Sequence, residues 1–245
     1  MNATVFPPLK DCPQPPLTDT QKRILELKKE RDAVILAHNY VCPEIQDVAD
    51  YVGDSLGLSR QVKKAGAKVI AFAGVDFMAE TAKILNPDKT VVIPDRAAGC
   101  SLEELCEPLE LAAFKKKHPG AIVISYINCG AGVKELSDII CTSGNALDIV
   151  RQIPADKEII FCPDQNLGSW IIEQTGRDMI LWDGYCRAHV QYNAEELLEA
   201  KKAFGGAPLV CHPECPKAVR DVSDCVCSTE KMIKFCRENP SDKFI

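Results

Sequence analysis

Three apolar, strand-like runs in this chain end in similar polar residues at an almost constant spacing. The leading residues are His38, Tyr126 and His212, so the first step is 88 residues and the second is 86. A hydroxyl residue follows each of them at the expected start of a helix, with the same two steps, at Ser55, Ser143 and Thr229. Landmarks that recur in one order and at one period indicate internal repetition. The spacing therefore predicts a pseudo-threefold molecule.

Two cysteines follow the same spacing. Cys100 and Cys186 each lie just past an apolar run, and 86 residues separate them. One further step falls at position 272, whereas the sequence ends at Ile245. The third unit has its first strand, its hydroxyl residue and its first helix, and a new strand begins near Lys243. We therefore expect the third unit to be incomplete in this chain.

Apolar runs alternate with helical patterns along the whole chain. Strands are expected at 33–37, 68–73, 90–93, 121–127, 158–162, 179–182 and 208–211, and helices at 17–29, 43–51, 55–65, 76–85, 102–117, 136–153, 167–175, 194–204 and 230–237. Continuous apolar strands between helices are typical of parallel sheets that are covered on both faces. The predicted fold class is α/β, a pseudo-threefold arrangement of three small parallel-sheet α/β domains with the third incomplete. The expected divisions are a leader and N-terminal helix at 1–32, a first unit at 33–118, a second at 119–204 and the start of a third at 205–245.

Composition narrows the functional classes. The net charge of −6 argues against nucleic acid or an anionic membrane surface as the main partner. No apolar run approaches the roughly 20 residues that cross a bilayer. The N-terminal residues hold several prolines and no apolar signal core, so we expect a flexible leader and a cytoplasmic protein. Thirteen cysteines in such a chain favour thiol or metal chemistry over a disulfide framework, although most are expected to be small buried residues.

Ligands of parallel α/β sheets bind beyond the carboxyl ends of the strands, which is where the recurring polar residues lie. Three similar units around an axis would direct these strand ends to one central point. Thiolates from Cys100 and Cys186 in such a cavity suggest a metal centre. Three cysteines related by the repeat would leave one iron of a cubane without a protein ligand, free to act as a Lewis acid. A cysteine in a Gly-rich loop is, however, more often a packing residue.

The hydroxyl residues and the proton carriers each have a second interpretation. A Ser or Thr at a helix start binds anions with the free N–H groups, but simple helix capping explains any one of the three hydroxyls equally well. Histidine and tyrosine at strand ends are commonly structural, yet several residues here suit proton transfer: His38, Tyr40, Tyr126, His212 and Glu214. His189 follows Cys186 by three residues and can orient its loop or contact a ligand.

A series of short motifs runs in order through the chain from about Leu36. It comprises His38-Asn39-Tyr40, Gly53-Asp54-Ser55-Leu56, the segment 74–83, Ala98-Gly99-Cys100-Ser101-Leu102, Tyr126-Ile127-Asn128, Cys141-Thr142-Ser143, Pro163-Asp164, Asn166-Leu167-Gly168, Gly184 with Cys186, His212-Pro213-Glu214-Cys215 and Ser228-Thr229. This series resembles the quinolinate synthase family of NAD biosynthesis over nearly the whole chain. No single motif is decisive, but so many in the same order are specific.

The resemblance implies three small α/β domains in a triangle, with the active site on the pseudo-threefold axis. It also implies a reaction that condenses iminoaspartate with dihydroxyacetone phosphate to quinolinate, with loss of phosphate and water. A [4Fe–4S] cluster held by three cysteines would act as the Lewis acid. In this pathway an aspartate-oxidising enzyme supplies iminoaspartate.

By the same resemblance, Cys100 and Cys186 match the first two cluster cysteines. The substrate-binding positions of the family match His38, Ser55, Tyr126, Asn128, Ser143, His212, Glu214 and Thr229. The proton-transfer pair of the family matches Tyr40 and Glu214, and His212 is expected as a third catalytic residue.

The chain departs from the family pattern in two ways. The family's third cysteine lies in a C-terminal segment that this sequence lacks, and Cys225 and Cys227 are extra thiols that do not fall at the third ligand position. We expect an active full-length parent and an impaired truncated chain. Two alternatives stay open. One is a cluster-free fragment that binds anionic ligands without catalysis, and the other is a zinc enzyme of aldolase type that uses His38, His189 or His212.

Overall fold

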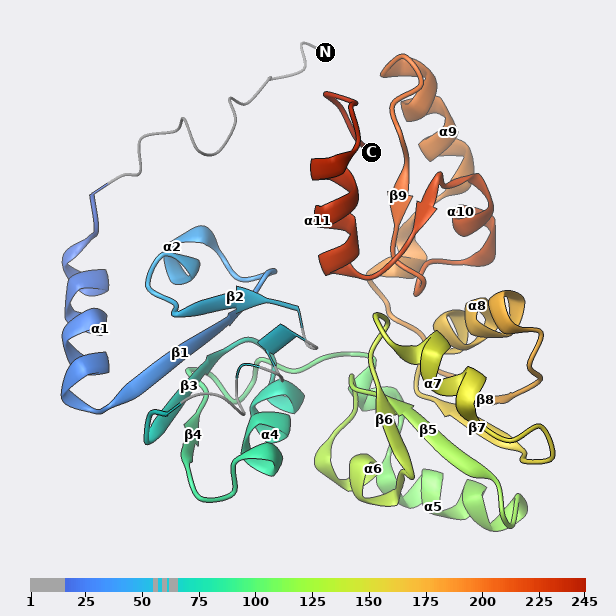
Figure 1. The fold of residues 1–245 in the computed structure, drawn as a ribbon, viewed down its shortest axis with the longest axis horizontal. Helices are drawn as coiled ribbons and strands as arrows, with labels where there is room; N and C mark the ends of the chain where they lie inside the picture. The colour runs from blue at the N-terminus through green and yellow to red at the C-terminus, as the bar shows by residue number, and fades with distance from the viewer. Residues whose placement is uncertain (1–15, 55–56, 59–60, 62–65) are drawn as a thin grey trace.

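The computed structural model describes residues 16–54, 57–58, 61 and 66–245. The expected leader at 1–15, Ser55 and much of the helix expected at 55–65 lie outside the described residues. In the described part, three groups of strands and helices surround a common centre, and the chain passes through them in order (Figure 1). All strand pairs are parallel, which confirms the α/β class. None of the described helices is both long and apolar enough to cross a membrane.

The first group is built on a four-stranded sheet with the order β2-β1-β3-β4. Its strands are β1 (Ala33–His38), β2 (Tyr51–Gly53), β3 (Val69–Ala73) and β4 (Thr90–Val92), and its helices include α1 (Asp19–Glu30), α2 (Pro43–Gln46) and α4 (Asp76–Leu85). Thr18 and Gln21 form a reciprocal capping box that fixes the start of α1. β1 is buried along almost its whole length, as expected for the inner strand of a covered sheet.

The second group repeats this topology with the order β6-β5-β7-β8. Its strands are β5 (Ile122–Tyr126), β6 (Ile139–Cys141), β7 (Ile159–Cys162) and β8 (Ile180–Leu181). Its helical elements are η2 (Glu103–Leu105), α5 (Pro108–Lys117), α6 (Ala131–Leu136), α7 (Ala146–Gln152) and α8 (Gln165–Thr175). The central strand β7 is buried at every residue.

The third group has the two-stranded sheet β10-β9. It contains β9 (Val210–Cys211), β10 (Cys225–Val226), η3 (His189–Gln191), α9 (Ala194–Ala203), α10 (Lys217–Val222) and α11 (Thr229–Glu238). The backbone of Ile245 accepts from Val210 N at 2.8 Å and donates to Pro208 O at 3.0 Å. β10 and the residue after it donate instead to the carbonyls of Leu209 and Cys211, the residues that alternate with Pro208 and Val210. Ile245 therefore lies on the opposite side of β9, the side that β3 and β7 occupy beside β1 and β5.

The same pair of hydrogen bonds, made by an aspartate and the first strand, occurs in all three groups. The carboxylates of Asp50, Asp138 and Asp224 each accept, at 2.8 Å, the N–H of the residue 15 positions earlier, in or beside the first strand of the group. The backbone N–H of each aspartate donates back to the carbonyl of that same residue. The aspartates are 88 and 86 residues apart, which are the steps found from the sequence. The repeat is therefore present in the hydrogen bonds as well as in the topology.

Several elements differ from those expected. Instead of one helix at 102–117, a short η2 turn is followed by α5, because Pro108 has no N–H to continue a helix and Glu107 precedes it in an extended conformation. The helix expected at 136–153 is instead β6 and α7, and α6 ends at the residue where that helix was expected to begin. The helix expected at 43–51 ends at Gln46, and β2 follows. β2, β6 and β10 are only two or three residues long, too short to show a period in the sequence.

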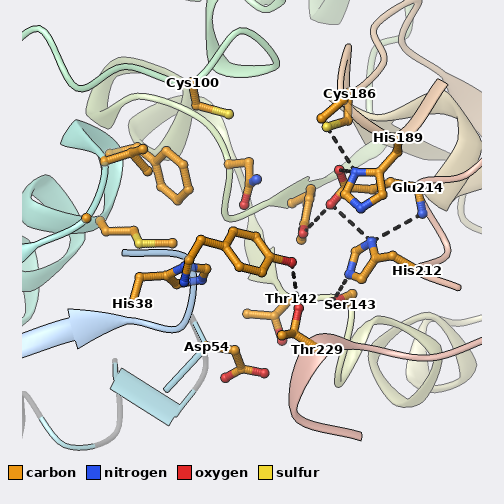
Figure 2. A pocket seen from close by; sticks show the side chains of 18 of the residues that line it. His38, Asp54, Cys100, Thr142, Ser143, Cys186, His189, His212, Glu214 and Thr229 are labelled. Carbon is orange, nitrogen blue, oxygen red and sulfur yellow. Dashed lines mark hydrogen bonds and ion pairs between the residues drawn. The ribbon is translucent and has the colours of Figure 1, made fainter. Parts of the chain in front are cut away.

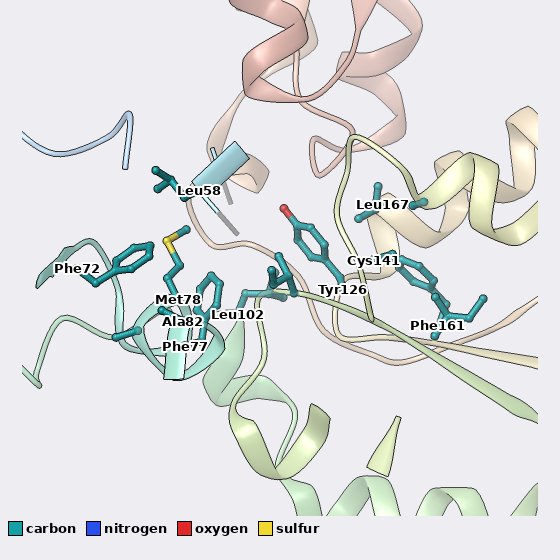
Figure 3. Packing of buried hydrophobic residues seen from close by; sticks show 14 of the residues in the cluster. Leu58, Phe72, Phe77, Met78, Ala82, Leu102, Tyr126, Cys141, Phe161 and Leu167 are labelled. Atoms are coloured by element: carbon teal, nitrogen blue, oxygen red, sulfur yellow. The ribbon is translucent and has the colours of Figure 1, made fainter. Parts of the chain in front are cut away.

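The largest hydrophobic core joins the first and second groups. Phe72, Phe77 and Met78 from the first group share one buried cluster with Phe161 and Leu167 from the second (Figure 3). The third group has a small cluster of its own, formed by Cys211, Cys215 and Val219. The first two groups are therefore held together by apolar packing.

Candidate active site

A cavity of about 460 Å³ opens where the three groups meet. Ten of the eleven predicted site residues line its wall: His38, Tyr40, Cys100, Tyr126, Asn128, Ser143, Cys186, His212, Glu214 and Thr229. The eleventh, Ser55, lies outside the described residues. The structure thus brings together side chains that are up to 191 residues apart in the sequence, as His38 and Thr229 are.

The two cysteines reach the cavity on equivalent loops. Cys100 and Cys186 lie along the same edge of the cavity in Figure 2. The first backbone N–H of α4 donates to the carbonyl of Ala98 at 2.8 Å, and the first N–H of α8 donates to that of Gly184 at 2.8 Å. Both carbonyls lie two residues before their cysteine. One loop geometry therefore presents both thiols.

The Cys186 loop has an additional support that the Cys100 loop lacks. Asp164 is fully buried, and one of its oxygens caps α8 by accepting from Leu167 N at 2.7 Å. Its other oxygen accepts from Cys186 N at 3.0 Å. Burial and the charge of Glu214 raise the pKa of Asp164 to about 7. At Gly184 any side chain would meet Pro163 O at 2.4 Å, so the loop packs directly on the Pro163–Asp164 backbone.

Glu214 is the centre of a buried polar cluster. One carboxylate oxygen accepts from the Tyr126 hydroxyl at 2.6 Å, and the other lies 3.2 Å from His189 Nδ1. His189 Nδ1 is also 3.0 Å from Cys186 Sγ, and the His189 ring packs against that of His212 with centroids 5.0 Å apart. Figure 2 shows His189, His212 and Glu214 side by side below Cys186. A thiol, two imidazoles, a phenol and a carboxylate therefore form one continuous network.

The charges in this network follow from burial and contact. Burial alone would raise the pKa of Glu214, but the His212 and His189 rings and the Tyr126 hydroxyl lower it to about 2. Burial lowers the pKa of His189 less than its hydrogen bonds to Cys186 and Glu214 raise it, to about 10. Burial also lowers the pKa of His212, whose Nδ1 accepts from Glu214 N at 3.3 Å. At neutral pH we therefore assign an anionic Glu214, a cationic His189 and a neutral His212.

The two described hydroxyls make contacts across the cavity and cap no helix. Ser143 precedes α7 by three residues, and its Oγ lies 3.0 Å from His212 Nε2. Thr229 is the first residue of α11, and its Oγ1 lies 2.9 Å from the Tyr40 hydroxyl. Both residues thus join one group to another. The helix-capping interpretation does not apply to either of them.

Two further residues face the cavity with unusual environments. His38 is buried, accepts from Tyr40 N at 3.2 Å through Nδ1, and has a pKa that burial lowers to about 4, so it is neutral. Asn128 Oδ1 is buried and meets no hydrogen-bond donor in the described part of the chain. An unpaired buried carbonyl oxygen beside a cavity is costly unless a ligand donates to it.

Sequence reasoning missed other residues of this wall. Asp54 and Thr142 line the cavity beside predicted residues, and Asp164 holds the Cys186 loop from behind. His189 was expected to orient the Cys186 loop or contact a ligand, and as a ligand in the zinc alternative, but its contact with Glu214 was not predicted. Asp164 had a signal in the sequence, because an aspartate before a helix caps it, but its second hydrogen bond depends on the tertiary fold. Cys225 and Cys227 have sulfur atoms 3.5 Å apart and are not among the lining residues.

Three parallel-sheet groups that share one cavity of thiol, imidazole, carboxylate and hydroxyl side chains define an α/β enzyme with its site between repeated units. Residues 22–245 match the family model described as quinolinate synthetase A protein. The chain belongs to this family.

Relatives with the name quinolinate synthase are similar over almost the whole chain. The protein of a Synechococcus species is 54% identical over 238 residues, which are 97% of this chain and 73% of the relative. That of a Synechocystis species is 51% identical over 245 residues, 100% of this chain and 76% of the relative. That of Thermosynechococcus vestitus is 53% identical over 235 residues, which are 96% of this chain and 74% of the relative. The chain spans about three quarters of the length of these relatives.

Proposed function

We propose that this chain carries most of the active site of a quinolinate synthase. The reaction would condense iminoaspartate with dihydroxyacetone phosphate and release phosphate and water, for the biosynthesis of NAD. The observation that carries the proposal is the convergence of ten predicted residues from three groups on one cavity of about 460 Å³. An aspartate-oxidising enzyme would supply the first substrate. We propose the units 33–118, 119–204 and 205–245, counted from the first strand of each, so that α5 and α9 end one unit in the sequence but pack on α6 and α10 of the next group. The cytoplasm, where thiols remain reduced, is the proposed location.

The chemistry of the donors fits two ligands of an iron–sulfur cluster. Cys100 and Cys186 are the cysteines among the described cavity-lining residues, and thiolates are the usual ligands of such clusters. Burial raises the pKa of Cys100, but the backbone N–H groups of Glu103 and Leu102 oppose this by stabilising its thiolate. A [4Fe–4S] cluster would supply a Lewis-acidic iron at this edge of the cavity. The repeat predicts its third cysteine at position 272 of a longer chain.

The remaining wall suits small, anionic, oxygen-rich substrates. Ser143 and Thr229 present hydroxyls, and His38 is neutral and has its Nδ1 occupied, so its Nε2–H is available as a donor. Asn128 Oδ1 requires an N–H or O–H donor, which an imine nitrogen in its protonated form or a hydroxyl of a triose would provide. These residues can bind and orient both substrates without a large change of the fold.

Glu214 and its neighbours suit proton transfer. The anionic carboxylate accepts a hydrogen bond from the Tyr126 hydroxyl at 2.6 Å, and the neutral His212 links the Glu214 backbone to Ser143. Tyr40 lies across the cavity, with its hydroxyl 2.9 Å from Thr229. Removal of water from an intermediate needs one group that takes a proton from carbon and another that gives one to the leaving hydroxyl. We assign these two roles to Glu214 and Tyr40, with His212 holding Glu214 in position.

Anaerobic reconstitution with iron and sulfide tests the proposal. We expect bound iron with the spectrum of an iron–sulfur cluster, and a loss of that spectrum in both Cys100→Ser and Cys186→Ser. Cys236→Ser is the matched control, because Cys236 lies on α11 and does not line the cavity. Quinolinate formation from the two substrates is then measured with the reconstituted protein. Equal iron binding in all four proteins would contradict the cluster assignment, and anion binding without cluster or turnover would support the fragment alternative.

A further inference from the structure

Three donor atoms of three different kinds converge at one edge of the cavity. Cys186 Sγ lies 3.0 Å from His189 Nδ1, and His189 Nδ1 lies 3.2 Å from Glu214 Oε2. All three donor atoms are within 4.8 Å of one another. We propose that Cys186, His189 and Glu214 form a binding site for a single divalent cation of the Zn²⁺ type. This site goes beyond the cluster function proposed above.

Two of the three ligand separations are close to those of a tetrahedral site, and the third, between Cys186 Sγ and Glu214 Oε2, is within 4.8 Å. With Zn–S of about 2.3 Å and Zn–N and Zn–O of about 2.0–2.1 Å, tetrahedral ligands lie roughly 3.3 Å apart for N and O and roughly 3.6 Å apart for S and N. The nitrogen–oxygen separation of 3.2 Å already agrees. The sulfur–nitrogen separation of 3.0 Å must lengthen by roughly half an ångström. Cys186 is only partly buried, so its side chain has room for this movement.

The charges and supporting contacts also suit a divalent ion. When the cation displaces the protons of Cys186 and His189, the thiolate, the carboxylate and the neutral imidazole carry two negative charges, which one divalent cation neutralises. The Tyr126 hydroxyl donates a hydrogen bond to Glu214 Oε1 at 2.6 Å, so that Oε2 faces His189. Asp164 accepts a hydrogen bond from the backbone N–H of Cys186 at 3.0 Å. Metal ligands in proteins are commonly oriented by hydrogen bonds of this kind.

The fourth position of such a site faces the central cavity. All three ligands line that cavity, so a water molecule or an oxygen of a bound anion can complete the tetrahedron. Cys186 is also one of the two thiols assigned to the cluster. The single-ion state and the cluster state therefore exclude one another: Cys100 belongs only to the second, and His189 and Glu214 belong only to the first. This division of ligands allows the two to be tested separately.

Cobalt(II) is the probe, because thiolate-bound Co²⁺ in a tetrahedral site absorbs in the near ultraviolet and the visible. We expect the metal-free protein, titrated anaerobically with Co²⁺ alone, to bind one equivalent with these bands, and Zn²⁺ to displace it. Cys186→Ser should abolish the thiolate band. His189→Gln and Glu214→Gln should each weaken Co²⁺ binding by at least about tenfold. Cys100→Ser and the double variant Cys225→Ser/Cys227→Ser should bind as the parent does.

Two results would overturn this site. The first is Co²⁺ binding that His189→Gln leaves unchanged and Cys100→Ser removes, which would assign the ion to the Cys100–Cys186 pair. The second is binding that is lost only with Cys225 and Cys227. X-ray absorption at the zinc edge on the unaltered protein needs no variant: one sulfur with nitrogen or oxygen neighbours supports the site, and two or more sulfurs contradict it. Reconstitution with iron and sulfide remains the separate test of the cluster, since it requires Cys100.

Discussion

Asp164 acts at the scale of a single residue, because its two carboxylate oxygens hold two different backbone segments. One oxygen caps α8 and the other holds the N–H of Cys186. Asp164→Asn retains only one acceptor oxygen, so we expect it to keep the cap and release Cys186. Asp164→Ala loses both contacts and about 1 kcal/mol of stability from the lost cap. Hydrogen–deuterium exchange of the Cys186 amide should be faster in both variants, and urea unfolding should show the stability loss in Asp164→Ala.

The matched control is Asp183→Asn. Asp183 lies in the same loop and is exposed, and among the described residues its side chain accepts a hydrogen bond from Gln165 at 3.3 Å. In Asp183→Asn, the hydrogen–deuterium exchange of the Cys186 amide should be as fast as in the parent. An unchanged Cys186 exchange in Asp164→Asn would show that this carboxylate does not hold the thiol loop.

His38 should make the stability of the protein depend on pH. Its pKa is about 4 in the folded state, below the ordinary value of 6.5, because the ring is buried. The unfolded chain therefore binds the proton more readily than the folded chain between pH 6.5 and 4. Stability is fully present above pH 6.5, falls through this window, and gains no further dependence from His38 below it. The full loss is on the order of 3 kcal/mol.

Urea unfolding at a series of pH values measures this effect as a difference. The curve for His38→Gln should be flatter than that of the parent between pH 6.5 and 4. His118→Gln serves as the comparison, since His118 lies at the end of α5 beside Glu158 and away from the cavity. Parallel curves for the parent and His38→Gln would refute the prediction.

Single site residues were predictable where a repeat marked them. His38, Tyr126 and His212 could be found because each follows an apolar run at the same step. The role of Glu214 as the centre of a network could not, because its partners Tyr126 and His189 come from distant segments. The same holds for Asp164, whose contact with Cys186 spans 22 residues. Sequence patterns report local order, whereas these hydrogen bonds depend on tertiary packing.

At the scale of elements, the repeated aspartates fix the first strand of each group. Asp138 accepts from the N–H of Val123, a residue with no exposed surface. Asp138→Ala leaves that donor without its acceptor, and we expect a loss of about 1 kcal/mol in the free energy of unfolding. Asp138→Asn keeps an acceptor oxygen and should lose clearly less. Urea unfolding and amide exchange at Val123 measure both quantities.

A control for this element is Asp148→Ala. Asp148 is an exposed residue of α7 that forms an ion pair with Arg151 at 3.5 Å. Its removal should leave the exchange at Val123 unchanged. If Asp138→Ala and Asp138→Asn were equally stable, the carboxylate of Asp138 would have no role in holding β5.

The elements themselves were predictable in part, and the errors have physical causes. α4 agrees at both ends with the expected 76–85, because its apolar face and its flanking residues are clear in the sequence. The short strands β2, β6 and β10 were not found, since two or three residues cannot show an alternation. The three missed strands occupy the same position in the three groups. The same short strand was therefore missed once in each repeat, for the same reason.

At the scale of the whole molecule, Arg220 ties the third group to the second. Its guanidinium is buried and donates to Asn166 O at 3.1 Å, Ser169 Oγ at 2.9 Å and Glu173 at 3.0 Å, all at α8. Because Glu173 is 32% exposed, we expect Arg220→Ala to cost about 1.5–3 kcal/mol, the usual range for hydrogen bonds of a charged group. We expect Arg220→Ala to loosen the third group and to accelerate limited proteolysis in the connection between β8 and β9.

Lys217→Ala is the control, because Lys217 is 62% exposed and lies 3.9 Å from the same Glu173. The Lys217→Ala variant should be cleaved between β8 and β9 at the same rate as the parent. Cleavage of Arg220→Ala at the parental rate would mean that the third group is held by other contacts.

The overall plan was the most predictable part. Steps of 86 to 88 residues between strand ends indicated three units around one site, and the structure has three sheets around one cavity. The apolar contact that joins the first two groups could not be predicted, because Phe77 and Phe161 appear in the sequence only as residues of separate units.

The cavity wall has a consequence for how such a protein can arise. One unit, with one cysteine loop, one strand-end His or Tyr and one hydroxyl, forms only one part of the wall. Three copies of that unit around a cyclic axis would complete it, as in a homotrimer. In a homotrimer every substitution appears three times, so the three positions cannot change independently. Fusion into one polypeptide removes this constraint, and it allows His38, Tyr126 and His212 to differ while Glu214 occurs once.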